Sequence, residues 1–125
     1  MEANRCDGAT DSREWLFDMT WGKGDKSSKN YFCEMPFIME CEWNKDRGEI
    51  FRDFEKLLIA KAPHKLFIYE QDDDPKVDEV AKDLYANIVT FKMKMPEERY
   101  LLAGWSGESK RFICNSVILR KKYFS

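Results

Sequence analysis

Apolar and polar residues alternate along two stretches in the first third of the chain, residues 15–21 and 35–43. Alternation with a period of two predicts strands with one apolar face and one more polar face. Each stretch also carries acid in its middle: Asp18 in the first, and Glu40 and Glu42 in the second. Because an unpaired carboxylate is costly to bury, these three acids need a cation, a proton or water beside them.

The same alternation predicts how the two stretches pair. In a hairpin that brings their bulky apolar faces together, Asp18 lies on the same side of the sheet as Glu40 and Glu42. The intervening residues 22–30 are rich in glycine, serine and lysine and are predicted to form a loop. We therefore expect the three acids to converge on one side of the sheet.

The rest of the pattern predicts two helices and three more strands. Apolar residues recur at helical spacing over residues 49–62, and again from an Asp-Asp-Asp-Pro helix start at 72–75 to about residue 93. Three short apolar runs are predicted strands: residues 65–70, 99–105 and 111–119. The order β-β-α-β-α-β-β predicts an α/β fold, bordering on α+β, in which a mixed sheet is flanked by two helices.

Length and composition fit one domain over residues 1–125, with residues 1–13 expected to be a loosely ordered N-terminus. The 21 basic and 23 acidic side chains nearly cancel, so bulk charge does not favour nucleic acid, and binding to it needs a local basic cluster. Lys23, Lys26 and Lys29 form a candidate cluster that could follow a phosphate backbone. A plain solvated loop is the alternative.

Membrane and zinc-binding proteins are not expected from this sequence. No apolar run approaches the roughly 20 residues that span a bilayer. Residues 1–12 are polar and lack the apolar centre of a signal peptide, so we predict a cytoplasmic protein without a membrane partner. The four cysteines form no Cys-x-x-Cys pair, which predicts free thiols in a reducing compartment.

Four segments together form a pattern that has a known counterpart. They are Phe17-Asp18, Glu40-Cys41-Glu42, the helical run Asp53-Phe54-Glu55-Lys56-Leu57-Leu58 and the apolar strand 65–70. In this order they resemble the catalytic core of the PD-(D/E)xK nuclease superfamily, which has the restriction-endonuclease-like fold. A hard cation such as Mg²⁺ prefers oxygen ligands, often one or two carboxylates. The resemblance implies Asp18 and Glu40 as ligands of Mg²⁺ or Mn²⁺, with the carbonyl of Cys41 as a third.

The sequence departs from the family pattern at Glu42, which stands where the family normally has a lysine. Some members carry this lysine on the following helix instead, and Lys56 is the match here. The resemblance implies that Glu42 assists the chemistry or binds a second ion. It implies that Lys56 positions water or stabilises the leaving charge, in a Mg²⁺-dependent hydrolase of nucleic-acid phosphodiester bonds.

Two other hypotheses stay open from the sequence. The chain could be a catalytically inactive binding module with the same fold, because the lysine on the strand is missing. It could also be a small α+β interaction or inhibitor protein whose acidic strand face docks on a basic surface, and a protein partner or a homodimer would suit it. In that case Asp18, Glu40 and Glu42 face solvent, and Lys56 forms an ordinary surface ion pair with Asp53.

Overall fold

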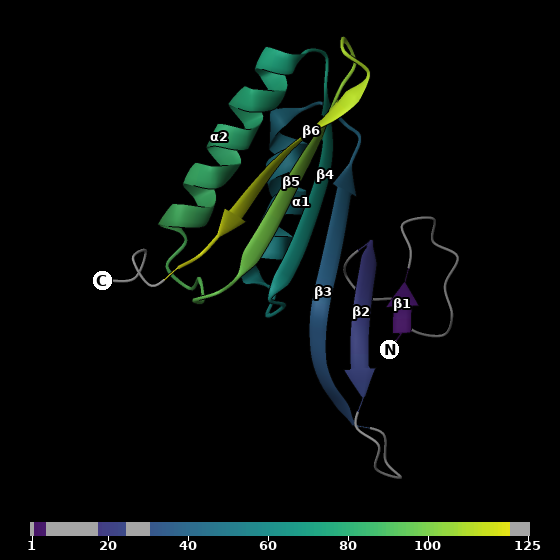
Figure 1. Cartoon of the computed structure of the whole chain (residues 1–125), viewed down its shortest axis with the longest axis vertical. Helices are drawn as coiled ribbons and strands as arrows, with labels where there is room; N and C mark the ends of the chain where they lie inside the picture. Colours follow the sequence, from purple (N-terminus) through teal and green to yellow (C-terminus); the bar gives the residue numbers. More distant parts are fainter. Residues whose placement is uncertain (1, 5–17, 25–30, 121–125) are drawn as a thin grey trace.

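The computed structural model contains a six-stranded sheet and two helices, built from residues 2–4, 18–24 and 31–120, which are the residues that the structure describes (Figure 1). The elements in chain order are β1 (Glu2–Asn4), β2 (Met19–Gly24), β3 (Phe32–Glu42), α1 (Arg47–Ile59), β4 (His64–Gln71), α2 (Asp74–Thr90), β5 (Arg99–Ser106) and β6 (Arg111–Ile118). The predicted mixed sheet flanked by two helices is thus confirmed, with one additional strand at the start.

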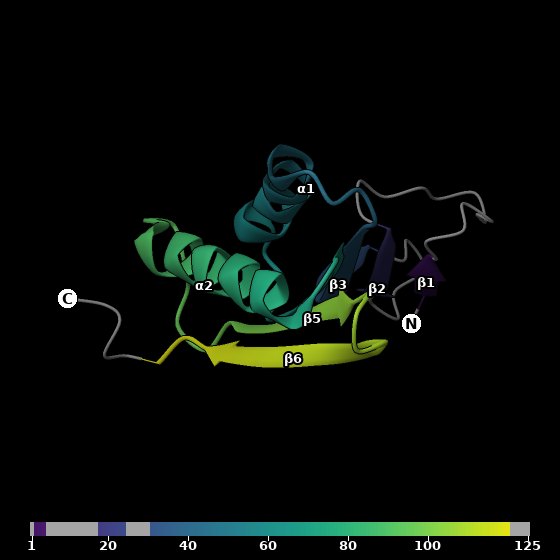
Figure 2. The ribbon, with the colours of Figure 1, turned by 90° about the horizontal axis from the view of Figure 1, so that it is seen from above.

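The strands lie side by side in the same order as they follow along the chain. β1, β2 and β3 pair antiparallel, β3, β4 and β5 pair parallel, and β6 returns antiparallel beside β5. Each parallel connection crosses over through a helix, and both helices lie on the same face of the sheet (Figure 2). α1 packs on β3 and β4, and α2 packs mainly on β5 and β6, so no helix of the described residues covers the opposite face.

Acidic residues begin both helices. The side chain of Asp46 accepts a hydrogen bond from the backbone N–H of Glu49 at 3.2 Å, and that of Asp73 accepts one from Lys76 N–H at 2.9 Å. Such caps satisfy backbone donors that the first helical turn leaves unpaired. α1 ends at Ile59, before the predicted end at residue 62, and α2 ends at Thr90 rather than near residue 93.

The core lies between the sheet and the two helices. Along β4, alternate side chains are buried under the helices, which gives the strand one covered and one partly open face. The hydroxyl of Tyr69 donates a hydrogen bond to the carbonyl of Val77 at 3.0 Å and so ties the sheet to α2. The largest fully buried apolar residues are Tyr69, Tyr100, Phe54, Phe67, Ile38, Ile50, Leu57, Leu84, Ile88, Leu102 and Leu119.

A buried ion pair lies in the same covered layer. Lys65 Nζ donates hydrogen bonds to the carboxylate of Glu98 and, at 3.2 Å, to the hydroxyl of Tyr100. Glu98 also accepts a hydrogen bond from the backbone N–H of Met95 at 2.6 Å. Because both charged groups are paired and hydrogen-bonded, the core tolerates them.

Several boundaries differ from the sequence predictions. β2 continues to Gly24, so Lys23 lies in a strand rather than in a loop, while residues 15–17 and 25–30 fall outside the described part of the chain. Residues 2–4 form a strand inside the segment that we expected to be loosely ordered. A short run gains this structure from backbone pairing with β2, which its own sequence does not reveal. Within the described ranges, no helix is long and apolar enough to cross a bilayer.

Candidate functional site

The register of β2 and β3 brings Asp18 next to Glu40. Met19 pairs with Met39 and Thr20 with Ile38, so Asp18, one residue before β2 begins, falls opposite Glu40. The side chain of Asp18 accepts a hydrogen bond from the backbone N–H of Cys41, with Oδ2 and N 2.7 Å apart. The structure thus brings together the two carboxyl groups that the alternation placed on one side.

Glu40 is buried beneath α1 although it carries an ionisable group. Its exposed fraction is 2%, and Phe67 is its register partner on β4. Burial, together with the nearby charge of Asp18 and a hydrogen bond between the two carboxyl groups, raises the pKa of Glu40 to about 8. Its Oε1 has no hydrogen-bond partner among the described residues. Glu40 therefore holds a proton at neutral pH and presents a buried oxygen with an unused lone pair.

Lys56 reaches the carboxyl groups from α1. Its Nζ lies 3.9 Å from Oε1 of Glu40 and 3.3 Å from Oδ1 of Asp53. Burial on its own lowers the pKa of the Lys56 ammonium, but Glu40 and Asp53 outweigh that effect and raise the pKa above its ordinary value. A fixed positive charge is therefore held beside Glu40.

Glu42 and Asp53 form a second pair of carboxyl groups at this place. A hydrogen bond with Asp53, followed by burial, raises the pKa of Glu42, although the backbone N–H of Asn44 donates to Glu42 Oε1 at 2.8 Å and acts the other way. In the sequence, Asp53 stands in the helical segment of the family resemblance and as a possible ion-pair partner of Lys56, but not among the candidate site residues. Its position one turn before Lys56 on the same helix was the signal that it belongs to the cluster.

The carbonyl of Cys41 is placed consistently with a role as a metal ligand. The N–H and C=O groups of one strand residue point toward the same neighbouring strand. Because the N–H of Cys41 donates to Asp18, its C=O also points to the side of β2 and Asp18. Two carboxyl groups and one carbonyl can thus approach a common point from β3 and from the start of β2.

Two carboxyl groups and one carbonyl match the type and the number of protein oxygen ligands that a hard divalent cation commonly has. Mg²⁺ is commonly bound through one or two carboxylates while keeping several waters. The buried Oε1 of Glu40 accepts no hydrogen bond within the described structure and has the ammonium of Lys56 as a neighbour at 3.9 Å, so it keeps a lone pair that a cation could use. The described ranges hold no group of three or more His, Cys, Asp or Glu side chains arranged to hold a metal. A cation here would therefore depend on backbone and water oxygens for its remaining ligands.

Among the three predicted nucleic-acid contacts, Lys23 falls in the described part of the chain, and it does not lie at the acidic cluster. Lys23 lies five residues beyond Asp18, roughly 16 Å along an extended strand. Its Nζ is 3.5 Å from Oε1 of Glu34, and both side chains are largely exposed. Lys26 and Lys29 lie outside the described residues. The prediction that these three lysines contact phosphate therefore stays a prediction.

The acidic side of β3 does not form an open docking surface. α1 packs on this strand, and Glu40 is almost completely covered. An inhibitor that uses exposed strand acids would need Glu40 to face solvent, which the structure does not provide. The covered arrangement instead leaves a small cluster between α1, β3 and the start of β2.

No protein-family model matches this chain, and no curated protein or solved structure matches it. The function is therefore inferred from five residues of the site. They are Asp18, Glu40, Glu42, Asp53 and Lys56.

Proposed function

We propose that this chain is a divalent-metal-dependent nuclease that hydrolyses phosphodiester bonds of nucleic acid. The observation that supports this most strongly is the meeting of Asp18 and Glu40 from neighbouring strands, with the ammonium of Lys56 3.9 Å from Glu40. The resemblance of the motif order to the PD-(D/E)xK superfamily supports the same proposal.

Asp18, Glu40 and the carbonyl of Cys41 are the proposed ligands of Mg²⁺ or Mn²⁺. Asp18 is oriented by the hydrogen bond from Cys41 N–H, so one of its oxygens is fixed by the backbone of β3. Glu40 must lose its proton before it can serve as a ligand, because its pKa is raised to about 8. When bound, a cation at this point supplies activation of water and neutralises charge on a phosphodiester.

Lys56 has the role of a fixed cation in this proposal. Its ammonium stays charged because Glu40 and Asp53 raise its pKa. From α1 it can donate a hydrogen bond to an attacking water or to a phosphate oxygen that gains charge in the transition state. This would replace the lysine that the family usually carries on the strand, where Glu42 stands in this sequence.

Glu42 and Asp53 are proposed to accept and release a proton near the reacting group. Their hydrogen bond raises the pKa of Glu42, which brings its titration closer to neutral pH than that of a free glutamate. When Glu42 is ionised, one of its oxygens can accept a proton from water. Glu42 is only partly buried, so exchange with solvent water is possible from its position at the end of β3.

A cleavage assay tests the proposal. Supercoiled plasmid, single-stranded DNA and single-stranded RNA are incubated with the full chain and Mg²⁺ or Mn²⁺ at about pH 8.5, where Glu40 is largely ionised. We expect metal-dependent cleavage of at least one substrate. Glu40→Gln and Asp18→Asn should abolish it, and Lys56→Met should reduce the rate roughly a hundredfold or more, as loss of one charged transition-state donor does.

Matched controls separate chemistry from folding. Glu55→Gln changes an exposed glutamate of α1, and Lys82→Met changes an exposed lysine of α2; both should retain the full rate. The Glu40→Gln protein should melt no lower than the original, because Gln resembles the protonated glutamate. No metal-dependent cleavage above the Glu40→Gln background would refute the enzyme proposal. Metal binding at Asp18 and Glu40 without cleavage would instead favour the inactive binding module.

A further inference from the structure

The face of the sheet opposite the helices has no layer of described structure over it. Both helices lie on the other face, as Figure 2 shows. On β5 the side chains that point away from the helices alternate with those of the core, and the register of β5 and β6 extends this open face to β6. Soluble monomers rarely leave a wide apolar surface uncovered, so we expect another surface to pack on this open face.

Apolar side chains extend over this open face from β3 to β6. Leu101 is 40% exposed, whereas its neighbours Tyr100 and Leu102 are buried, and Phe112 on β6 is 48% exposed. The apolar residues of this face include Phe37, Leu66, Leu101, Trp105, Phe112 and Ile118.

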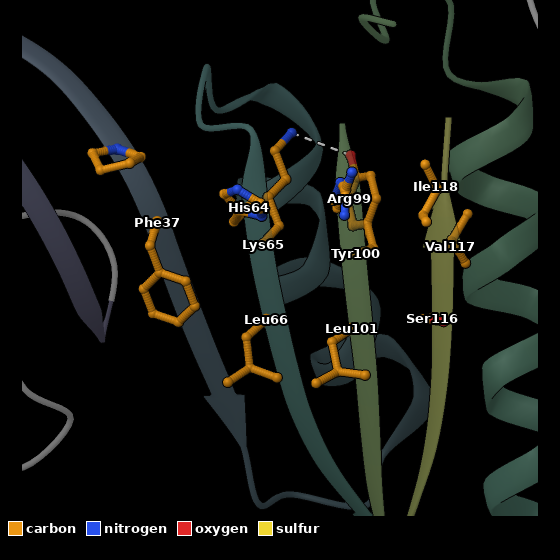
Figure 3. A pocket seen from close by; sticks show the side chains of 11 residues that line it. Phe37, His64, Lys65, Leu66, Arg99, Tyr100, Leu101, Ser116, Val117 and Ile118 are labelled. Atoms are coloured by element: carbon orange, nitrogen blue, oxygen red, sulfur yellow. Dashed lines mark hydrogen bonds between the residues drawn. The ribbon is translucent and has the colours of Figure 1, made fainter. Parts of the chain in front are cut away.

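One end of the open face is hollowed. The hollow has a volume of about 710 Å³, and Figure 3 shows Phe37, Leu66 and Leu101 lying side by side within it. Ile118 lines it from β6, and Arg99 stands at its rim at the start of β5. A hollow of this size can receive one or two large apolar side chains.

The other end of the same face carries an aromatic pair. Trp105 and Phe112 are register partners on β5 and β6, and their rings meet edge to face with centroids 5.0 Å apart. Glu70 is the register partner of Trp105 on β4, so a carboxylate lies beside the aromatic pair. The open face thus has a basic, hollowed end at Arg99 and an acidic, aromatic end at Glu70.

We propose that the open face binds a second copy of this chain, with the two sheets face to face and their strands antiparallel. The two copies are related by a two-fold axis that lies between the two sheets. The axis runs perpendicular to the strands, at the level of Leu102, and it exchanges the two ends of the face. It brings the Trp105 and Phe112 pair of each copy over the hollow of the other. It also brings Arg99 of each copy to Glu70 and Trp105 of the other, so that charge and shape are complementary at both ends.

The open face is large enough for such a dimer. β4, β5 and β6 each have eight residues, and β3 is longer. At about 3.3 Å per residue and 4.8 Å between strands, these four strands outline roughly 500 Å² in projection. Side chains standing above that plane raise the accessible area toward the roughly 800 Å² per partner of a stable interface. Sheets that pack in this way lie about 10 Å apart.

Sedimentation equilibrium of the full chain and its charge variants tests the orientation as well as the association. The original protein should show twice the 14.9 kDa mass of one chain. Arg99→Glu alone and Glu70→Arg alone should each raise the dimer dissociation constant at least about tenfold, because each creates two like-charge contacts across the two-fold axis. The double variant Arg99→Glu with Glu70→Arg should regain most of the affinity, because it exchanges the charges at both ends.

Lys82→Glu is the matched control, since it reverses an exposed charge on α2, away from the open face. It should leave the dimer unchanged. A monomeric original protein at high micromolar concentration would overturn the proposal. So would a dimer in which neither single charge reversal has an effect, or in which the double variant is weaker than both single variants.

Thiol reactivity supplies a second measurement that needs no substitution. Cys114 is exposed and is the register partner of Ala103 near the middle of the open face, whereas the exposed Cys33 lies near the start of β3. Mass spectrometry after brief alkylation at several protein concentrations should show Cys114 becoming protected as the dimer forms, while Cys33 is modified at a constant rate. Equal, concentration-independent modification of both thiols would contradict an interface on this face.

Discussion

Nζ of Lys56 lies 3.9 Å from Oε1 of Glu40, a buried carboxyl oxygen without a hydrogen-bond partner among the described residues. The lysine lowers the pKa of Glu40, but burial and the charge of Asp18 prevail and raise it to about 8. A protonated acid beside a fixed cation is a poor arrangement for stability alone. It is a suitable one for a carboxyl group that ionises when a metal ion arrives.

The raised pKa of Glu40 predicts that stability falls as pH rises in the absence of divalent metal. In the unfolded chain this group titrates near its ordinary value of 4.5, so from about pH 4.5 to pH 8 only the folded state retains the proton. The stabilising contribution of protonated Glu40 is fully present below pH 4.5 and is lost by pH 8. Glu40→Gln removes this loss, so its stability advantage should grow to roughly 4 to 5 kcal/mol at pH 8.5.

Urea unfolding in EDTA at pH 4.5, 6.5 and 8.5 measures this difference. Glu55→Gln, which neutralises an exposed glutamate on the same helix, is the control and should show little pH-dependent advantage. If Glu40→Gln is destabilised equally at all three pH values, then Glu40 is ionised in the folded protein and the account of its environment is wrong.

Gly104 is predicted to be indispensable for the packing of α2 on β5. A Cβ at this position would lie 2.5 Å from Cγ1 of Val77 and 2.7 Å from the ring of Tyr69. Because both neighbours are buried, relief requires a shift of the helix, and Gly104→Ala should cost about 1 to 3 kcal/mol. In Gly107→Ala the nearest atom is 3.3 Å away, so urea unfolding should show a smaller loss. Equal losses would contradict the close approach at Gly104.

Removing only one partner of the buried pair Lys65 and Glu98 is predicted to destabilise the fold more than removing both charges. Lys65→Met leaves the carboxylate of Glu98 buried without its cation and should cost about 3 kcal/mol. Adding Glu98→Gln removes the stranded charge while the amide oxygen can still accept from Met95 N–H, so most of the loss should return. Thermal unfolding of both variants checks this. A double variant as unstable as Lys65→Met would show that the lost stability comes from packing instead.

The alternation of side chains was sufficient to predict that Asp18 and Glu40 face the same way. A period of two determines which face each strand residue occupies, and the apolar faces of β2 and β3 leave one favourable register. Helix starts at Asp46 and Asp73 were likewise close to the predicted ones, because capping depends on a few neighbouring residues. Features that depend on local sequence were therefore predictable.

Features that depend on distant segments were not predictable in this way. The sequence pattern of α1 and α2 shows an apolar stripe on each helix, but it does not say which face of the sheet each helix covers. Asp53 joins the acidic cluster only because α1 packs on β3. Lys23 was assigned to a loop from its glycine-rich surroundings, whereas backbone pairing with β3 extends the strand through it. Each of these outcomes is decided by tertiary contacts rather than by composition.

Mn²⁺ binding followed by electron paramagnetic resonance between pH 6 and pH 9 tests the central claim most directly. Because the metal must displace the proton of Glu40, the apparent dissociation constant should fall roughly tenfold for each pH unit up to about pH 8 and then level off. Asp18→Asn and Glu40→Gln should each abolish tight binding. Absence of Mn²⁺ binding at every pH, or binding that survives both substitutions, would contradict the proposal that these two carboxyl groups form a metal site.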